Sequence, residues 1–225
     1  MKKLDQLRAR AQQVRDVLPG GYGRTSLAQE GEDLILERIF EHRGTGIYVD
    51  VGAHHPLRFS NTHLLYRRGW HGVNIDATPG SMEPFRRMRP RDINLEIGVG
   101  PKDEVRDFYV FDEPALNTFD GERATSLEHY KVEAIRQVRC APLSAILAEH
   151  SIGAIDLLTI DAEGYDFEVM KTLDWDKSRP HIVLTEQFSR DIAKLLESAP
   201  HAYLAERGYQ LVAKTFNSVF YVRGT

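Results

Sequence analysis

The chain has 225 residues, which is enough for one large domain or two small ones. It carries 29 Lys and Arg residues against 33 Asp and Glu residues, a net charge of −4, and this acidic balance argues against general nucleic-acid binding. With 42% hydrophobic and 28% charged residues, it has the composition of a globular protein rather than a disordered one.

Cys140 is the single cysteine, so an intrachain disulfide and a CxxC metal or redox site are both excluded. No apolar stretch approaches the roughly 20 residues that cross a bilayer. The first residues are charged and polar and lack the apolar centre of a signal peptide. Together these features predict a cytoplasmic protein.

Residues 1–22 predict an amphipathic helix ahead of a single domain over 23–225. Apolar residues recur at helical intervals from Leu4 to Leu18, and the Pro-Gly-Gly sequence at 19–21 ends the pattern. The opposite face is basic, so the helix could contact a membrane surface or a partner. The alternative is a helix that docks on its own domain and leaves its basic face in solvent.

The first half of the domain alternates helices with strands. Ser26 and Gln29 have the spacing of a capping box, which predicts the start of a helix. Gly69 follows two arginines and suits the position after a helix end. The expected helices cover 27–42, 64–66 and 79–88, and the expected strands cover 47–51, 72–76 and 93–99.

The second half is less regular at first and then returns to alternation. Residues 100–140 predict only a strand at 108–111 and a helix at 126–134. Two β-rich runs, 209–214 and 219–222, flank a turn and predict a terminal hairpin. The remaining expected elements are helices around 143–147 and 167–170, strands at 155–160 and 182–185, and a helix over 191–207 that Pro200 interrupts.

This alternation is typical of an α/β domain with a mostly parallel sheet, helices on both faces and, here, an antiparallel hairpin strand at the end. No linker-like stretch divides residues 23–225, which favours one domain. In such sheets ligands bind beyond the carboxyl ends of the strands. The residues that follow each expected strand are therefore the candidates for a functional site.

The first strand ends in Asp50, Val51 and Gly52, and the second ends at Asp76. An acidic residue more than twenty residues beyond a glycine turn can accept hydrogen bonds from both hydroxyls of a ribose. The pair of strand ends therefore indicates a cofactor that contains a nucleoside.

Two features bear on which cofactor this is. A dinucleotide site needs GxGxxG so that the backbone can approach a pyrophosphate, but His54 and Leu57 occupy the later glycine positions. Asp50 would also repel a pyrophosphate, whereas it suits the sulfonium and ammonium groups of S-adenosylmethionine. We therefore favour S-adenosylmethionine and keep a nicotinamide-dependent oxidoreductase or epimerase as the alternative.

Several stretches, in the same order, resemble the FkbM-type methyltransferases from about residue 26 to the C-terminus. One departure is His54, where many methyltransferases have a second glycine, although the His-His-Pro form resembles one branch of this family. The resembling stretches are Gln29 to Asp33, Tyr48 to Pro56, Ser60 to Thr62, Gly69 to Asp76, Asn117 to Phe119, and Ile160 to Gly164.

The resemblance implies a Rossmann-like class I methyltransferase fold, S-adenosylmethionine as cofactor, and methyl transfer to oxygen on a sugar of a glycan or on a secondary metabolite. It also implies which residues contact the cofactor. Asp50, Gly52 and Ala53 would line the methionine end and Asp76 the ribose; Gln29, Glu32 and Asn61 would lie near the cofactor or close the site; and Asp92 or the turn at Gly98 and Val99 would neighbour the adenine.

Methyl transfer to a hydroxyl needs a group that removes a proton. Asp161 and Glu163 follow the strand at 155–160, and Glu186 follows the strand at 182–185, at the edge where the acceptor is expected. His54 and His55 are further candidate bases because an unperturbed imidazole has a pKa of about 6.5. Alternatively, Asp161 and Glu163 only stabilise a helix N-terminus.

A metal ion is another way to activate a hydroxyl. Asp161, Glu186 and Gln187 would supply three oxygen ligands, which suit a hard cation such as Mg²⁺; otherwise they bind substrate without metal. The partners considered are a small-molecule or glycan acceptor and a second copy of the chain, and nucleic acid is not expected. The last alternative is a non-catalytic ligand-binding module of a glycan-synthesis complex.

Overall fold

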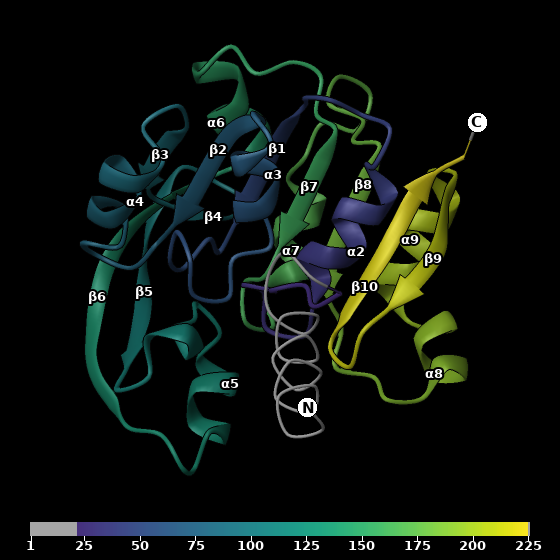
Figure 1. Ribbon diagram of the computed structural model, residues 1–225. Helices are drawn as coiled ribbons and strands as arrows, with labels where there is room; N and C mark the ends of the chain where they lie inside the picture. Colours follow the sequence, from purple (N-terminus) through teal and green to yellow (C-terminus); the bar gives the residue numbers. More distant parts are fainter. Residues whose placement is uncertain (1–21, 225) are drawn as a thin grey trace, which may run out of the picture.

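A seven-stranded sheet runs through the middle of the computed structural model, which describes residues 22–224 (Figure 1). The strand order is β3-β2-β1-β7-β8-β10-β9, and neighbouring strands are parallel except in the two pairs that include β10. The expected parallel sheet with a terminal hairpin is therefore confirmed. The strands are β1 (Ile47–Val51), β2 (His71–Asp76), β3 (Ile93–Glu96), β7 (Leu157–Ile160), β8 (Ile182–Glu186), β9 (Tyr209–Lys214) and β10 (Ser218–Arg223).

The order of the strands reverses at β1, which pairs with β2 on one side and β7 on the other. From β1 the chain first adds β2 and β3 on one side of the sheet, and later adds β7 and β8 on the other side. Such a reversal opens a crevice beyond the carboxyl ends of the central strands, where α/β sheets bind ligands. The ends of β1, β2 and β7 are therefore the place to look for a site.

Alternate residues of β1 point to opposite faces of the sheet, as the strand pleat requires. Val49 packs in a core covered by helices α6, α7, α8 and α9, and Tyr48 packs in a second core covered by α2 and α3. Asp50 shares the face of Tyr48 and contacts Thr62 at the start of α3. The helices are α2 (Glu32–Ile39), α3 (His63–Arg67), α4 (Met82–Met88), α6 (Leu143–Glu149), α7 (Asp166–Lys171), α8 (Ile192–Leu196) and α9 (Ala199–Glu206).

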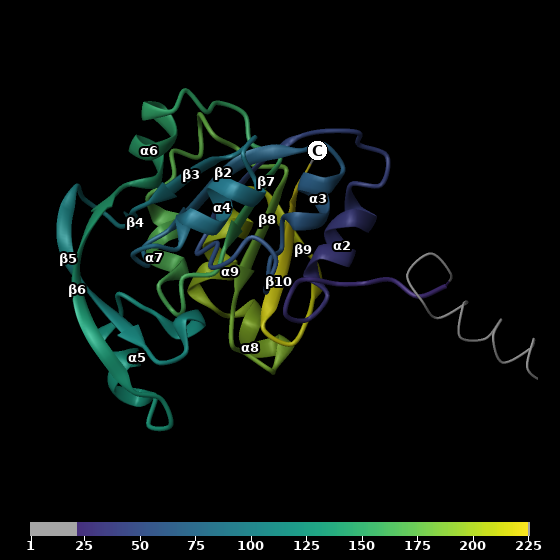
Figure 2. The ribbon, with the colours of Figure 1, turned by 60° about the vertical axis from the view of Figure 1, so that its left-hand side comes forward.

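Residues 104–141, here called the arm, leave the main sheet and return to it. The arm contains β5 (Glu104–Phe111), the short turn of helix η1 (Pro114–Leu116), α5 (Gly121–Ser126) and β6 (Val132–Ala141). Together with β4 (Gly98–Val99), its two strands form a second sheet in the order β4-β6-β5. Figure 2 shows the arm on one side of the main sheet, with α5 toward its far end.

Two expectations for this region were wrong. The helix expected at 126–134 is absent, because α5 ends at Ser126 and the chain from Val132 already belongs to β6. The single strand expected at 93–99 is divided into β3 and β4, which pair in different sheets. Ile97 marks the division, since its amide donates to the carbonyl of Asp76 and turns the chain out of the main sheet.

The helix expected at 27–42 is also shorter than predicted. It begins at Glu32, after Gly31 in the left-handed region (φ 87°), and Ser26 donates to the Asp33 side chain instead of capping a helix. The helix expected at 191–207 breaks before Pro200, which lies in the first turn of α9, where a proline costs no hydrogen bond. Ser198 caps that second helix.

The amphipathic helix predicted for residues 1–22 lies outside the described residues except at Tyr22. Over residues 22–224, no helix is both long enough and apolar enough to cross a membrane.

Candidate active site

A cavity with about 890 Å³ of empty space opens at the carboxyl ends of β1, β2 and β7. The arm closes one side of it with residues such as Asn117 and Phe119. Its position at the carboxyl ends of parallel strands, with apolar walls and a few polar groups, suits a small-molecule ligand. Of the residues that sequence reasoning selected, the cavity is lined by Gln29, Asp50, Gly52, Ala53, His54, Asn61, Asp76, Gly98, Val99, Asp161 and Glu163.

The glycine turn after β1 joins three strand ends. Gly52 adopts the left-handed conformation (φ 77°), and its amide donates to the carbonyl of Ile75 at 2.9 Å. The amide of Asp161 donates to the carbonyl of Val51 at 2.9 Å. The turn therefore brings bare backbone to the floor of the cavity, between the ends of β2 and β7.

Asp76 holds the loop that follows this turn. One carboxylate oxygen accepts from the amide of His54 at 2.8 Å, and the other accepts from the amide of Thr78 at 2.7 Å. His54 has a positive φ of 53°, a conformation that histidine tolerates better than most residues. This explains how the loop accommodates His54 where many methyltransferases have glycine.

Asp50 is 5% exposed and lines the cavity beside the glycine turn. Burial raises the pKa of its carboxyl to about 6, although Arg89 and the hydroxyl of Thr62 act in the opposite direction. Thr62 donates to it at 2.6 Å. Near neutral pH the cavity therefore presents a buried negative charge, which suits a cationic ligand.

The arm side of the cavity is apolar. Val99 and Phe108 are buried there, and the rings of Phe108 and Phe119 pack with centroids 4.6 Å apart. Ile97 and Gly98 complete this part of the lining. Such a wall suits a flat heterocycle, and the expectation that Gly98 and Val99 neighbour an adenine stays a prediction.

Three carboxylates meet beside the cavity: Asp161 and Glu163 line it, and Glu186 lies next to them but lines a neighbouring pocket instead. Asp161 and Glu163 follow β7 and Glu186 ends β8, and each offers an oxygen within 4.8 Å of the others. We call them the carboxylate trio. Asp161 Oδ1 and Glu186 Oε2 are buried without a hydrogen-bond partner among the described residues. Buried polar atoms are normally paired, so these two oxygens are available to a ligand.

The trio holds protons more tightly than isolated carboxyls do. Burial, reinforced by the neighbouring acids, raises the pKa of Asp161 well above its usual range and that of Glu186 to about 8. Burial raises the pKa of Glu163 as well, while its ion pair with Arg123 opposes the shift. Near neutral pH the carboxyls of Asp161 and Glu186 therefore retain protons, and only their ionised fraction, which grows toward pH 8, can accept a proton from a reacting hydroxyl.

The arm is fastened to the rim of the cavity at several points. Arg58 forms two hydrogen bonds of 3.0 Å with Glu113, and Asn117 donates to the hydroxyl of Thr78 at 3.0 Å. Beside the trio, Arg123 of α5 pairs with Glu163 and lies over the ring of Phe188. Its Nε is buried without a partner among the described residues.

Asp92 is not where it was expected. It does not line the cavity, and its carboxylate accepts from the hydroxyl of Tyr48, the amide of Gly72 and the guanidinium of Arg89. These groups lie in the interior behind β2, so the expectation that Asp92 neighbours an adenine was wrong. The turn at Gly98, the other position considered, does line the cavity.

Glu32 and Gln187 also have other partners. Glu32 accepts from the hydroxyls of Thr215 and Ser218 and ties α2 to the terminal hairpin. The amide of Gln187 donates to Tyr221 and accepts from Ser198, which turns it away from the trio. Glu163, rather than Gln187, is therefore the third oxygen group beside Asp161 and Glu186.

The two histidines of the loop after β1 have different surroundings. His55 Nδ1 accepts from the amides of Leu57 and Arg58 at 3.1 Å and 3.0 Å, and His55 does not line the cavity. His54 does line it, and burial lowers the pKa of its imidazole, which keeps it neutral and able to accept a proton. Of the two histidines, only His54 is placed to act as a base.

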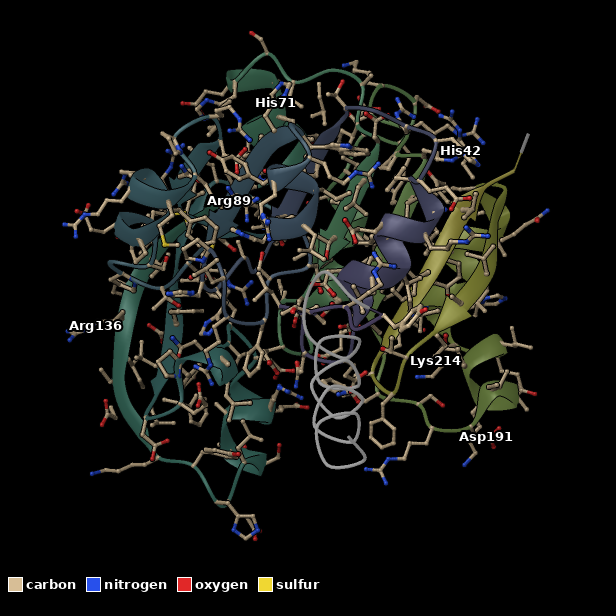
Figure 3. The ribbon with its side chains drawn as sticks, in the orientation of Figure 1. His42, His71, Arg89, Arg136, Asp191 and Lys214 are labelled. Atoms are coloured by element: carbon tan, nitrogen blue, oxygen red, sulfur yellow. The ribbon has the colours of Figure 1, made fainter. Side chains whose placement is uncertain are left out.

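Sequence reasoning assigned no role to four residues that shape the site. Arg123 and Phe119 belong to the arm, whose elements carried no clear periodicity. Thr62 donates a hydrogen bond to Asp50 and accepts one from Arg89. Arg89, labelled in Figure 3, lies in the interior near β2. The sequence carried two signals: Thr62 and Phe119 lie in stretches that resemble the family, and Arg89 stands three residues before its partner Asp92.

A family model described as the methyltransferase FkbM domain matches residues 50–211. No curated protein matches the chain significantly.

Two solved structures resemble the chain at low identity. One is a candidate RNA methyltransferase from Pyrococcus horikoshii, 8% identical, covering 87% of this chain and 84% of that one with a TM-score of 0.43. The other is a TehB-like SAM-dependent methyltransferase from Corynebacterium glutamicum, 11% identical, covering 96% of this chain and 97% of that one with a TM-score of 0.40.

Proposed function

The chain belongs to the FkbM methyltransferase family and is an S-adenosylmethionine-dependent methyltransferase of the Rossmann-like class I fold, and from this premise we propose that it methylates a hydroxyl oxygen of a sugar. The sugar would belong to a glycan or a secondary metabolite. The carboxylate trio beside the cavity carries this proposal.

The trio suits a neutral hydroxyl better than a charged nucleophile. Asp161 Oδ1 and Glu186 Oε2 can each accept a hydrogen bond, and Arg123 Nε can donate one. A sugar carries neighbouring hydroxyls that both donate and accept, so one pyranose could satisfy all three buried atoms. An acceptor without hydroxyl donors would leave the two oxygens buried and unpaired, which is costly.

We assign the rest of the cavity to the cofactor. Asp76 would accept from the ribose hydroxyls, and Asp50 would face the ammonium and sulfonium charges. The proposed cofactor contacts are Asp50, Gly52, Ala53, Gln29 and Asn61 at the methionine end, Asp76 at the ribose, and Gly98 and Val99 at the adenine.

When bound, S-adenosylmethionine supplies a methyl group that a hydroxyl oxygen can displace from sulfur. The protein's part is to hold that hydroxyl in line and to remove its proton. The trio would orient the hydroxyl through Asp161 and take the proton onto a carboxylate oxygen. His54 is the second candidate base, since its neutral imidazole also faces the cavity.

A divalent cation is the second candidate for the same space. Asp161 and Glu186, with Glu163 in place of Gln187, form an oxygen-only donor set of the kind Mg²⁺ prefers. The guanidinium of Arg123 beside Glu163 opposes a second cation there. Calorimetric titration with Mg²⁺ in the presence of S-adenosylhomocysteine, compared between wild type and Asp161→Asn, would detect a metal held by the trio.

A direct test combines cofactor binding with methyl transfer. We expect S-adenosylhomocysteine to bind wild type, to bind Asp76→Ala at least about tenfold more weakly, and to bind a control at exposed Asp176, Asp176→Ala, unchanged. Labelled methyl groups should appear on hydroxyls of a sugar panel with wild type and not with Asp161→Asn.

The two remaining hypotheses have their own outcomes in this test. Binding of NAD with no binding of S-adenosylhomocysteine would favour an oxidoreductase or epimerase. Cofactor binding without transfer to any acceptor would favour a ligand-binding module. A label on nitrogen rather than oxygen would contradict the proposed acceptor chemistry.

The domain division and the partners stay predictions. We propose residues 23–225 as one catalytic domain, with residues 1–22 as a separate helix whose basic face could contact a membrane surface. Removing residues 1–22 should leave S-adenosylhomocysteine affinity unchanged, and light scattering of both forms would report whether copies of the chain associate.

A further inference from the structure

A fully buried arginine lies two hydrogen bonds from the cofactor cavity. Arg89 follows α4 and has none of its surface exposed (Figure 3). Its Nε donates to Asp92 at 2.8 Å, and its Nη2 donates to the hydroxyl of Tyr48 at 2.7 Å. A buried guanidinium requires such partners, because an unpaired charge in the interior is strongly destabilising.

The same guanidinium reaches Asp50 through Thr62. Arg89 Nη2 donates to Thr62 Oγ1 at 2.9 Å, and Thr62 donates to Asp50 Oδ2 at 2.6 Å. The direction follows from chemistry, since a guanidinium can only donate and a hydroxyl has a single hydrogen. Thr62 accepts from Arg89, so its hydrogen goes to Asp50. All three side chains are buried.

The two carboxylates around Arg89 differ in what they leave free. Both oxygens of Asp92 accept hydrogen bonds, from Tyr48, Arg89, Gly72 and Asn74. Asp50 Oδ1 accepts none from residues 22–224, and Asp50 lines the cavity. The single positive charge of Arg89 lies between two carboxylates, Asp92 and Asp50. Because Asp92 is fully hydrogen-bonded in the interior, the remaining negative charge faces the cavity at Asp50.

We propose that Thr62 and Arg89 are positioning residues that orient Asp50 Oδ1 toward the cationic amino-acid end of the cofactor. Arg89 fixes the hydroxyl of Thr62, and Thr62 fixes the carboxylate. The inference rests on the proposed placement of S-adenosylmethionine in this cavity.

The test compares two ligands that differ only at that end of the cofactor. S-adenosylhomocysteine carries the amino-acid group, and 5′-methylthioadenosine lacks it. We expect Thr62→Val to weaken S-adenosylhomocysteine about tenfold, as the loss of a charge-assisted hydrogen bond predicts. Binding of 5′-methylthioadenosine should change less than about twofold, and Thr62→Ser, which keeps the hydroxyl, should restore the affinity for S-adenosylhomocysteine.

Thr185→Val is the matched control. Thr185 is 1% exposed and donates to the buried Asp166, which does not line the cofactor cavity. Loss of the Thr185 hydroxyl should leave the affinities for S-adenosylhomocysteine and 5′-methylthioadenosine unchanged. Thermal melts of all variants would confirm that they fold.

The outcomes separate this inference from the proposed function. Equal weakening of both ligands by Thr62→Val, or no weakening of either, would overturn the positioning role. Failure of wild type to bind either ligand would instead overturn the placement of the cofactor. Arg89→Lys, which keeps the charge but cannot reach three acceptors at once, should resemble Thr62→Val.

Discussion

Gly52 and Asp161 are in main-chain contact at the floor of the cavity: a Cβ built on Gly52 would lie 1.7 Å from the carbonyl oxygen of Asp161. The turn of β1 and the end of β7 therefore approach more closely than any side chain would allow. This contact sets the distance between the proposed cofactor site, at Gly52, and the carboxylate that begins the trio.

We predict that Gly52→Ala separates these two strand ends and abolishes S-adenosylhomocysteine binding. The substitution adds the left-handed strain of a non-glycine residue and a clash with backbone that cannot rotate away. Together these should cost at least about 3 kcal/mol of the free energy of unfolding. Chemical denaturation and calorimetric titration would measure the two effects.

Gly80→Ala provides the matched control for that substitution. Gly80 has a similar positive φ of 86°, but a Cβ there would have nothing within 4 Å. Gly80→Ala should therefore lower the free energy of unfolding by the backbone strain alone, about 1–2 kcal/mol. Equal losses at Gly52 and Gly80 would contradict the importance of the contact with Asp161.

Cofactor affinity should depend on the ionisation of Asp50. Burial raises the pKa of this carboxyl from 3.8 to about 6, with Asp92 and Asp76 adding to the shift and Arg89 opposing it. Only the ionised form attracts an ammonium, so the affinity for S-adenosylhomocysteine should fall as the pH drops through about 6. Titrations between pH 5 and 8 would show this, and Asp50→Asn should flatten the profile.

5′-Methylthioadenosine serves as the control ligand, because it has no ammonium to lose. Its affinity should stay level over the same range of pH. A parallel fall for both ligands would place the responsible group elsewhere in the cavity.

The carboxylate trio should lower the stability of the free protein at alkaline pH. Burial and the neighbouring acids raise the pKa of Glu186 from 4.5 to about 8, so the folded state binds more protons than the unfolded state between those values. The free energy of unfolding then decreases as the pH rises through this window. Glu186→Gln should melt higher than wild type at pH 8 and close to wild type at pH 4.5.

Each kcal/mol gained would appear as about 2–4 °C in the melting temperature of a chain of this size. Glu168→Gln, at a surface glutamate paired with Lys171, should change little at either pH. If Glu186→Gln melts lower than wild type at pH 8, the ionised carboxylates of the trio do not destabilise the folded protein, and the prediction is wrong.

The residues that sequence reasoning located correctly lie in contiguous motifs at strand ends. Asp50, Gly52 and Asp76 could be placed because the ends of neighbouring parallel strands meet at one edge of a sheet. Asp161 and Glu186 followed from the same rule. Gln187 did not, because Tyr221 and Ser198 hold its amide away from the trio, whereas Glu186 lies beside Asp161 and Glu163.

The rest depended on contacts that no local pattern reveals. Half of the ten residues of β6 are exposed, and the run from Ile135 to Gln137 interrupts the alternation of apolar and polar residues that identifies a half-buried strand. Asp92 follows α4, where a position near the cofactor was plausible, yet the buried Arg89 draws it into the interior. The strand β6 depends on its pairing with β5, and Asp92 is held in the interior by Tyr48 and Gly72 as well as by nearby Arg89.

The last prediction concerns Arg123, which connects the arm to the trio. Its ion pair with Glu163 lowers the pKa of that carboxyl against the effect of burial, and its Nε is buried without a hydrogen-bond partner among the described residues. Arg123→Met keeps the length of the side chain and removes its charge. With a sugar acceptor, methyl transfer should fall by about tenfold or more, as the loss of a charged hydrogen-bond donor predicts.

The affinity for S-adenosylhomocysteine should change less than about twofold in this variant, because Arg123 does not line the cofactor cavity. The matched control is Arg136→Met, at an exposed arginine on β6 of the same arm (Figure 3). Removing this charge should leave both cofactor affinity and turnover at the wild-type level. Arg123→Met with wild-type turnover would show that the arm does not contribute to the acceptor site, and the trio would then act without its neighbouring cation.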